Sequence, residues 1–335
     1  MVTGATGFIA SRLLPALADA GWAVRACGRR ARPGWMPADV AYLPADLAAD
    51  DLGALTVDVT HVFHLAGASS SVADEAEMQR SNVSATQRLV DALGPGVRRF
   101  VHMSSTSVYG ESVQLPLPVV EDVEPQPSRS YGKAKWGAEQ AVWSAAAAAA
   151  GLPAVVLRPV SVFGPGAVKL LASVLLDAAL ERFAGLDRFG VAGPPIEQRL
   201  VHVDDLVAAC LYLASHPDAV GKAFNVASLY PSSHEVAEVV AAEIGLELEV
   251  VDDPEAEVGL AGDARQAVHD QMVASGMTTD IILSPERLRL LAKGNCNNRL
   301  SNDALAATGF RFVHTDLATE IAADVAWYRD RRWLI

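Results

Sequence analysis

The segment Thr3-Gly4-Ala5-Thr6-Gly7-Phe8-Ile9-Ala10 lies almost at the start of this 335-residue chain and leads directly into an apolar helical pattern. In such a strand, turn and helix, Gly4 permits the tight turn and Gly7 lets backbone amides approach a pyrophosphate at the amino end of the helix. A glycine-rich turn alone is weak evidence, but its setting strengthens it. We therefore expect cofactor contacts from Gly4, Thr6, Gly7, Phe8 and Ile9.

Apolar, β-rich runs alternate with helical patterns in the first half of the chain. Strands are expected at 23–27, 61–66, 99–103 and 154–157, and helices at 9–20, 75–93 and 131–150. Such alternation is typical of a parallel sheet with crossover helices. We predict an α/β fold with a Rossmann-type, doubly wound parallel sheet.

The pattern changes after Gly164-Pro165-Gly166, where helices are expected near 168–183 and 232–244 and the charged stretch 252–295 shows no strand alternation. Two further runs, 200–203 and 223–226, resemble strands that return to the sheet. We expect a dinucleotide-binding domain from 1–165, with 199–228 returning to it. A smaller, mainly helical C-terminal substrate-binding lobe is expected from 166–198 and 229–335.

Bulk composition excludes several classes of function. The chain is 51% hydrophobic and 20% charged, yet no apolar run approaches the roughly 20 residues of a membrane-spanning helix. No secretory signal pattern opens it, so we expect a soluble, cytoplasmic protein. The formal net charge of −13 disfavours nucleic acid and anionic membranes as partners.

Metal sites and disulfides receive little support. Cys27, Cys210 and Cys296 are far apart in the sequence and odd in number. His61 and His64 are three residues apart on an expected strand, so they face opposite sides. We expect no metal and no disulfide framework.

The end of the second expected strand indicates which dinucleotide binds. It reads Val24-Arg25-Ala26-Cys27-Gly28-Arg29-Arg30, without the carboxylate that would bind the ribose 2′-hydroxyl of NAD. A guanidinium suits a 2′-phosphate, so we favour NADP, with Arg29 first and Arg30 second; NAD and a merely solvated loop remain alternatives. Asp46 and Leu47 are placed to reach the adenine, although Asp46 could instead cap a helix.

The segment Ser130-Tyr131-Gly132-Lys133-Ala134-Lys135 begins an expected helix, on which Tyr131 and Lys135 share one face. A tyrosine titrates near pH 10 when free, so it needs a nearby ammonium to act as an acid or base near neutrality. Lys135 can supply that charge. The hydroxyls of Ser104-Ser105-Thr106 follow a strand, where they can hold a substrate oxygen.

Together these motifs resemble the extended short-chain dehydrogenase/reductase family, also called the NAD-dependent epimerase/dehydratase family. The resemblance rests on the glycine-rich turn, His64-Leu65-Ala66-Gly67, Ser104-Ser105-Thr106-Ser107-Val108-Tyr109-Gly110, Tyr131 with Lys135, Leu157-Arg158-Pro159, Phe163-Gly164-Pro165-Gly166 and Val201-His202-Val203-Asp204-Asp205.

The resemblance implies roles for individual residues. Ser105 would be catalytic, Tyr131 would be the general acid/base, and Lys135 would orient the nicotinamide ribose and lower the pKa of the tyrosine. Asn82 looks like the family's helix asparagine near the cofactor, with a plain helix residue as the alternative. Further cofactor contacts are implied at Leu65, Ala66, Gly67, Pro159 and Val160.

The sequence departs from the family pattern where substrates bind. Thr106 and Ser107 stand where sugar-nucleotide dehydratases place an Asp-Glu pair, and Gln198 stands where epimerases carry an arginine, with Arg199 shifted by one. Ser161 replaces the family's substrate asparagine. We expect substrate contacts from Ser105, Thr106, Ser161 and Gln198.

These departures favour a ketoreductase or alcohol dehydrogenase over a nucleotide-sugar epimerase with retained NAD(P), which stays the main alternative. A dinucleotide-sensing regulatory subunit is a third possibility, but it has no need of the Tyr131 and Lys135 pair. The partners expected are a small carbonyl or alcohol, or a sugar nucleotide, and a second subunit of a homodimer that pairs through helices 75–93 and 131–150.

Overall fold

The computed structural model describes residues 1–335 except 69–73, 111–114, 149–150, 255 and 284–298. The chain divides into two compact units. Unit 1 comprises Met1–Val160, Asp204–Ala227 and Asn298–Arg311, and unit 2 comprises Ser161–Val203, Ser228–Asn297 and Phe312–Ile335. No helix in the described part of the chain is long and apolar enough to cross a membrane.

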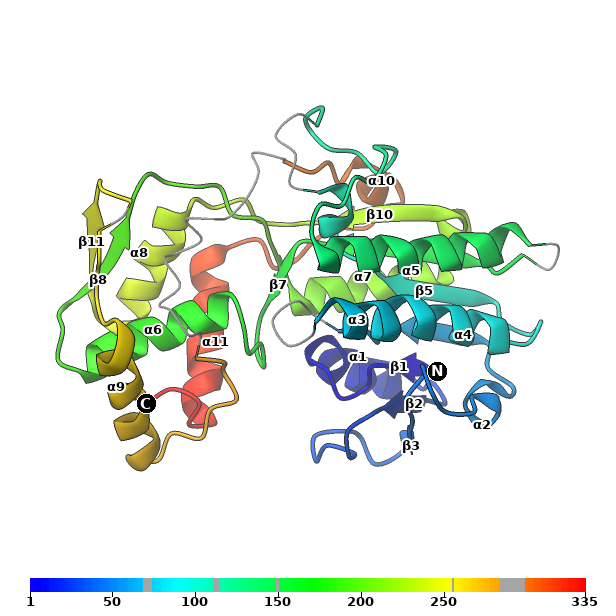
Figure 1. The fold of residues 1–335 in the computed structure, drawn as a ribbon, viewed down its shortest axis with the longest axis horizontal. Helices are drawn as coiled ribbons and strands as arrows, with labels where there is room; N and C mark the ends of the chain where they lie inside the picture. Colours follow the sequence, from blue (N-terminus) through cyan, green and yellow to red (C-terminus); the bar gives the residue numbers. More distant parts are fainter. Residues whose placement is uncertain (69–73, 111–114, 149–150, 255, 284–298) are drawn as a thin grey trace. The chain divides into compact units, whose positions relative to one another are not determined.

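The centre of unit 1 is a seven-stranded parallel sheet with the order β10-β6-β5-β4-β1-β2-β3 (Figure 1). Its strands are β1 Val2–Thr3, β2 Arg25–Gly28, β3 Ala41–Pro44, β4 His61–His64, β5 Arg99–Met103, β6 Ala154–Pro159 and β10 Lys222–Val226. Every residue of β5 and β6 is buried, as in sheets covered on both faces. The predicted Rossmann-type fold is confirmed.

Helices flank this sheet. They are α1 Phe8–Asp19, α2 Gly53–Thr56, α3 Glu75–Met78, α4 Ala85–Ala92, α5 Ser130–Ala147, α7 Val203–Ser215 and α10 Asp303–Ala307, with 3₁₀ turns η2 Thr106–Tyr109 and η3 Pro217–Ala219. The expected helix 75–93 is interrupted by a π-helical segment, η1 Gln79–Ser84. Such segments often mark functional positions, and this one contains Asn82.

The core beside α4 and α5 explains why these helices lie side by side (Figure 1). Leu89 of α4 and Val142 of α5 are fully buried in one apolar cluster with Val62 of β4 and Phe100 of β5. Burying such side chains stabilises the fold by about 1.5–3 kcal/mol each.

Unit 2 contains more regular secondary structure than the sequence indicated. Its helices are α6 Leu171–Phe183, α8 Ser233–Ile244, α9 Gly262–Ala274 and α11 Leu317–Asp330. It also contains a parallel pair that we did not expect, β8 Arg188–Ala192 with β11 Glu247–Val251. Helix α8 begins at a capping box formed by Ser232 and Glu235 and ends at Gly245 in the left-handed conformation, which only glycine adopts without strain.

The expected domain boundaries need three corrections. The strand near 200–203 is β9 Leu200–His202, which pairs with β7 Ser161–Phe163 in a small sheet of unit 2 and does not return to the main sheet. For the same reason the first segment of unit 1 ends at Val160 and not at 165. Residues 298–311 belong to unit 1, because Asn225 Nδ2 donates to Ser301 O at 3.2 Å and Tyr212 Oη donates to Thr308 O at 2.5 Å.

Candidate active site

The strand order of the main sheet reverses between β1 and β4, and the loops after these strands meet there. Gly4 has φ +66°, and a Cβ at this position would lie 2.7 Å from the backbone nitrogen of Ala66. Glycine is therefore required by conformation and by space. Open α/β sheets bind ligands at such a switch point, and Leu65, Ala66 and Gly67 follow β4 there.

The amino end of α1 has the features of an anion site. Gly7 is the N-cap residue, no side chain caps the helix, and Phe8 and Ile9 are its first two residues. The first amides of a helix lack partners inside the helix and attract negative charge. The glycine-rich turn thus fits the pyrophosphate of a dinucleotide.

Asn82 lies in the π-helical segment, against the loop after β4. Its Nδ2 donates to Met78 O at 2.9 Å and to Ala68 O at 3.3 Å, whereas its buried Oδ1 has no hydrogen-bond partner among the described residues. A Cβ on Gly67 would lie 2.4 Å from this oxygen and 3.2 Å from Lys135 Nζ. A buried acceptor without a donor fits a site that receives a hydrogen-bonding ligand.

Ser105, Tyr131 and Lys135 come from neighbouring elements of unit 1. Ser105 follows β5 as the N-cap of η2, with its Oγ 3.1 Å from Ser107 Oγ. Tyr131 and Lys135 occupy successive turns of α5, and Lys135 Nζ lies 5.9 Å from the centroid of the Tyr131 ring. Lys135 Nζ also donates to Met103 O at 3.0 Å, at the end of β5. The structure thus brings the three side chains together.

Burial perturbs the ionisation of both titratable groups. It raises the pKa of Tyr131, although hydrogen bonding to Ser105 works in the opposite direction. It lowers the pKa of Lys135 to about 8, and the Glu139 carboxylate opposes this effect. At neutral pH the phenol is therefore a neutral proton donor beside an ammonium group.

A buried polar network behind these residues was missed from the sequence. Arg158 NH2 donates to Glu139 Oε2 at 2.7 Å, and Arg158 NH1 donates to Tyr109 Oη at 2.9 Å. Tyr109 Oη donates in turn to Asn225 Oδ1 at 2.7 Å, and Ser104 Oγ donates to Glu139. The signals in the sequence were Glu139, four residues after Lys135 on the same helix face, and Arg158 in the Leu157-Arg158-Pro159 motif.

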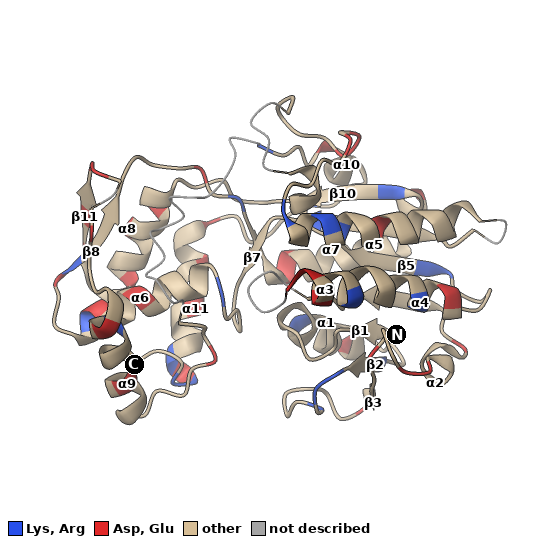
Figure 2. Ribbon diagram, viewed as in Figure 1, with Lys and Arg blue, Asp and Glu red and all other residues tan. Residues whose placement is uncertain are grey.

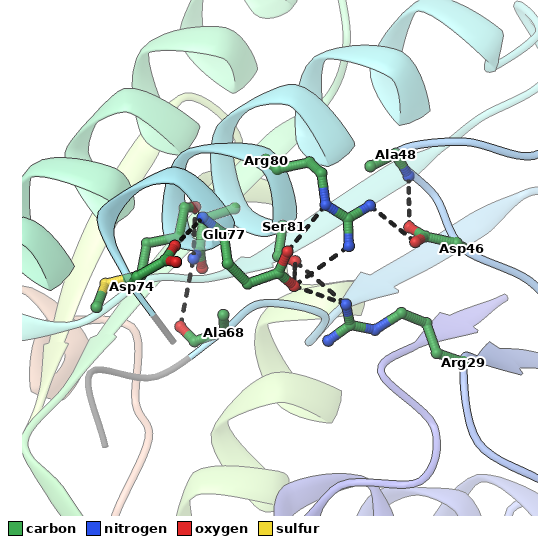
Figure 3. A network of polar contacts seen from close by, with 10 residues as sticks. Arg29, Asp46, Ala48, Ala68, Asp74, Glu77, Arg80 and Ser81 are labelled. Carbon is green, nitrogen blue, oxygen red and sulfur yellow. Dashed lines mark hydrogen bonds and ion pairs between the residues drawn. The ribbon is translucent and has the colours of Figure 1, made fainter. Parts of the chain in front are cut away.

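Arg29 and Arg30, expected at the adenosine end of the cofactor, follow β2 and make contacts within the chain. Arg29 NH1 donates to Glu77 Oε1 at 2.7 Å (Figure 3). Arg30 donates to Thr6, at 2.7 Å to its carbonyl oxygen and at 3.2 Å to its hydroxyl. Acidic residues gather at the start of α3, where Glu77 lies (Figure 2). Glu77 was not foreseen, because it stands 48 residues from Arg29.

Asp46 and Leu47, the two residues expected at the adenine, differ in exposure: the side chain of Asp46 is partly exposed, whereas Leu47 is buried. Asp46 accepts hydrogen bonds from Arg80 NH1 at 2.8 Å and from Ala48 N at 2.9 Å, so its side chain does cap the turn that follows β3. Leu47 is 6% exposed and belongs to the apolar core.

The carboxyl end of β6 holds the remaining residues expected in unit 1. Thr106 Oγ1 donates to Pro159 O at 3.4 Å, and Val160 N donates to Val226 O at 3.2 Å. The first contact keeps Thr106 and Pro159 beside each other, and the second holds Val160 against β10.

The two residues expected to bind substrate in unit 2 line one pocket. Ser161 and Gln198 lie there with Leu170, Leu171, Leu200 and Val236. Gln198 is buried, and its Nε2 donates to Ile196 O at 3.1 Å. The pocket is thus mainly aliphatic with two uncharged polar side chains.

Comparison with known proteins places the chain in a family. A model of the NAD dependent epimerase/dehydratase family matches residues 1–227. The chain belongs to this family. GDP-6-deoxy-D-mannose reductase of Pseudomonas aeruginosa is 29% identical over 265 residues, which cover 76% of this chain and 82% of the reductase. UDP-glucose 4-epimerase of Streptomyces lividans is 29% identical over 235 residues, which cover 63% of this chain and 70% of the epimerase.

A solved structure, MoeE5 in complex with UDP-glucuronic acid and NAD, matches 98% of both chains with a TM-score of 0.72 and 28% identity. The relatives of this chain thus include both a reductase and an epimerase. NAD(P) binding is supported by this membership and by the fit of Gly4, Gly7 and Asn82.

Ionisable groups in unit 2 also form a cluster that the sequence did not indicate. His202, His314 and Glu320 bring one ligand atom each within 4.8 Å of one another. His314 Nδ1 lies 2.9 Å from Glu320 Oε2, and the two imidazole rings stack at 4.1 Å. These contacts are those of a hydrogen-bonded pair with a stacked neighbour.

Cys27 and Cys210 are free and buried, whereas Cys296 lies outside the described residues.

Proposed function

We propose that this chain is an NADP-dependent oxidoreductase that reduces a ketone or oxidises a secondary alcohol, with Tyr131 as the general acid/base. The observation that carries the proposal is the placement of the Tyr131 phenol beside the Lys135 ammonium and the Ser105 hydroxyl. A phenol held in this way can donate its proton to the alkoxide that develops on the substrate. The reduction of a carbonyl requires that step.

Each residue of the chain would have one task in the reduction. The nicotinamide cofactor supplies the hydride when bound. Ser105 would donate a hydrogen bond to the carbonyl oxygen and stabilise the negative charge that develops there. Tyr131 would transfer its phenolic proton to this oxygen, and the nearby Lys135 ammonium would stabilise the phenolate that remains. In the oxidation of an alcohol the same groups would act in reverse.

The preference for NADP rests on the residues after β2. Arg29 and Arg30 stand there in place of a carboxylate, and guanidinium groups bind phosphate in a bidentate manner. The side chain of Arg29 is half exposed, so it is accessible to a ligand.

We infer the substrate class from the residues around Ser161 and Gln198 in unit 2. We propose that unit 1 binds the dinucleotide and that unit 2 binds the substrate, with contacts from Ser161 and Gln198. None of the six residues that line the pocket is charged. Aliphatic walls with a few polar groups suit an uncharged, partly apolar part of a substrate better than a diphosphate.

Epimerisation of a nucleotide sugar is the second candidate. The similarity to MoeE5 in complex with UDP-glucuronic acid and NAD favours it, as does the similarity to UDP-glucose 4-epimerase. Tyr131 would then serve as base and acid in turn, and the cofactor would stay bound without net consumption.

Stoichiometry separates the two candidates. NADPH and NADH are added separately to the purified protein with a panel of apolar ketones and nucleotide sugars. We expect one NADPH oxidised per ketone reduced, and no isomerised sugar. Isomerised sugar without loss of the cofactor would overturn net reduction and establish the epimerase.

We also retain a cytoplasmic location and a homodimer that pairs through α4 and α5 as proposals. Sedimentation of the purified chain tests the dimer: a mass of one subunit at micromolar concentration would contradict it.

A further inference from the structure

The residue that faces Arg29 is a carboxylate from a distant helix. Glu77, on α3, accepts a hydrogen bond from Arg29 NH1 at 2.7 Å (Figure 3). We propose that Glu77 weakens the preference for NADP over NAD, because its carboxylate competes with the 2′-phosphate of NADP for the guanidinium of Arg29. This inference rests on the dinucleotide binding proposed above.

The surroundings of Glu77 resemble those of a bound anion. Its carboxylate oxygens accept from Arg29 NH1, from Arg80 Nε at 2.9 Å and from Ser81 Oγ at 2.5 Å. Figure 3 shows both arginines pointing toward this one carboxylate. Two guanidinium groups and a hydroxyl are the donors that phosphate sites use. The Glu77 carboxylate thus occupies a set of hydrogen-bond donors that would also suit a phosphate.

The four charges of the ion-pair network that contains Glu77 are balanced. Arg29 and Arg80 carry two positive charges, and Glu77 and Asp46, which accepts from Arg80 at 2.8 Å, carry two negative charges. NAD has no 2′-phosphate, so it leaves this balance intact. NADP adds a phosphate of about two negative charges, and the repulsion is relieved only if the Glu77 carboxylate moves away from Arg29.

Protonation does not remove this competition. Hydrogen bonds from Arg80, Ser81 and Arg29 lower the pKa of Glu77 to about 2, so the group stays ionised at any working pH. Displacement is nevertheless feasible, because both Arg29 and Glu77 are partly exposed and exposed ion pairs hold weakly. The network therefore weakens the NADP preference without abolishing it.

The test compares two neutral replacements on the same helix. Glu77→Gln keeps the size of the side chain and removes its charge. Dissociation constants for NADP⁺ and NAD⁺ are measured by calorimetric titration. We expect Glu77→Gln to raise the affinity for NADP⁺ about tenfold relative to NAD⁺, which is about 1.4 kcal/mol. Glu75→Gln on α3 is the matched control, since Glu75 is exposed, and it should leave the ratio unchanged.

A third variant tests the route. Arg29→Ala combined with Glu77→Gln should lose the gain in NADP⁺ affinity, because the gain depends on the freed guanidinium. An unchanged ratio in Glu77→Gln would overturn the proposal, and so would an equal fall in both affinities, which would indicate that Glu77 only supports α3.

Failure of the proposed reaction can be told apart from failure of this inference. If no ketone is turned over but Glu77→Gln still shifts the NADP⁺ to NAD⁺ ratio, the inference stands and the reaction is wrong. If neither dinucleotide binds the unaltered protein, both are wrong.

Discussion

Tyr131 and Lys135 are neighbours on one face of α5, yet burial shifts their pKa values in opposite directions. In each case the buried environment disfavours the charged form. The tyrosine thereby remains a proton donor at neutral pH, and the lysine becomes costly for the fold. Two predictions follow from these shifts.

Tyr131→Phe should reduce the turnover number by about 10²–10⁴-fold, because the proton donor is lost while the ring remains. NADP⁺ binding, measured by titration, should change by no more than about threefold. Tyr212→Phe on α7, whose hydroxyl donates to Thr308 O, is the control and should keep full activity. Substantial turnover by the Tyr131→Phe protein would refute the role given to the phenol.

Lys135→Met should stabilise the fold while it inactivates the enzyme. The pKa of Lys135 is lowered by burial from 10.5 to about 8, so the unfolded chain holds the proton more tightly than the folded one. The charged lysine therefore destabilises the fold below pH 8 by about 3 kcal/mol, and this penalty disappears as the pH rises from 8 to 10.5.

Urea unfolding between pH 7 and pH 10.5 measures this effect. Lys135→Met should have a higher free energy of unfolding than the unaltered protein at pH 7. The gain should be smaller than about 3 kcal/mol, because the hydrogen bond from Lys135 to Met103 O is lost. The difference in stability between the two proteins should shrink at high pH. Lys133→Met is the matched control, since Lys133 is exposed on the same helix. A gain that does not vary with pH would contradict the prediction.

At the scale of elements, the ion pair between Glu139 and Arg158 joins α5 to β6. The two side chains are 0% and 4% exposed, and Glu139 also opposes the fall in the pKa of Lys135. The same carboxylate thus holds the helix against the sheet and supports the charge beside Tyr131. Loss of one partner leaves a buried charge without compensation.

Glu139→Gln should therefore lower the free energy of unfolding by about 3 kcal/mol or more. It should also move the alkaline limb of the pH-rate profile to lower pH, because the pKa of Lys135 falls further. Glu139→Gln with Arg158→Met should recover part of the stability, since the uncompensated guanidinium is removed. A double variant no more stable than the single one would count against this account.

At the scale of the whole molecule, two buried histidines in the main sheet limit stability in acid. Burial lowers the pKa of His64 from 6.5 to about 3 and keeps that of His102 well below its ordinary value. Both are therefore neutral in the fold and take up protons only on unfolding. The stability that they contribute is complete above pH 6.5 and is lost as the pH falls, by about 2 kcal/mol for His64 at pH 5.

Their replacement should reveal this dependence. His64 is hydrogen-bonded to Thr3 at 2.7 Å and to Thr86 at 2.8 Å, whereas neither ring nitrogen of His102 has a partner among the described residues. His102→Leu should consequently fold normally and lose less stability between pH 7 and pH 5, as followed by circular dichroism. His64→Leu breaks two buried hydrogen bonds and should be less stable at pH 7. Equal acid sensitivity in His102→Leu and the unaltered protein would disprove the assignment.

The sequence alone determined the features that depend on local order. The glycine-rich turn before α1, the alternation of strands and helices, and the shared face of Tyr131 and Lys135 each follow from spacings of a few residues, because backbone conformation and helix periodicity act at that range. The doubly wound sheet follows from them, since its connections are limited to few topologies.

Only the tertiary structure decided which distant residues meet. Glu77 with Arg29, Glu139 with Arg158, the pairing of β7 with β9 and the return of residues 298–311 to unit 1 are all contacts across many residues of chain. No periodic pattern encodes such contacts, because they depend on how whole elements pack and on which charges burial forces to pair.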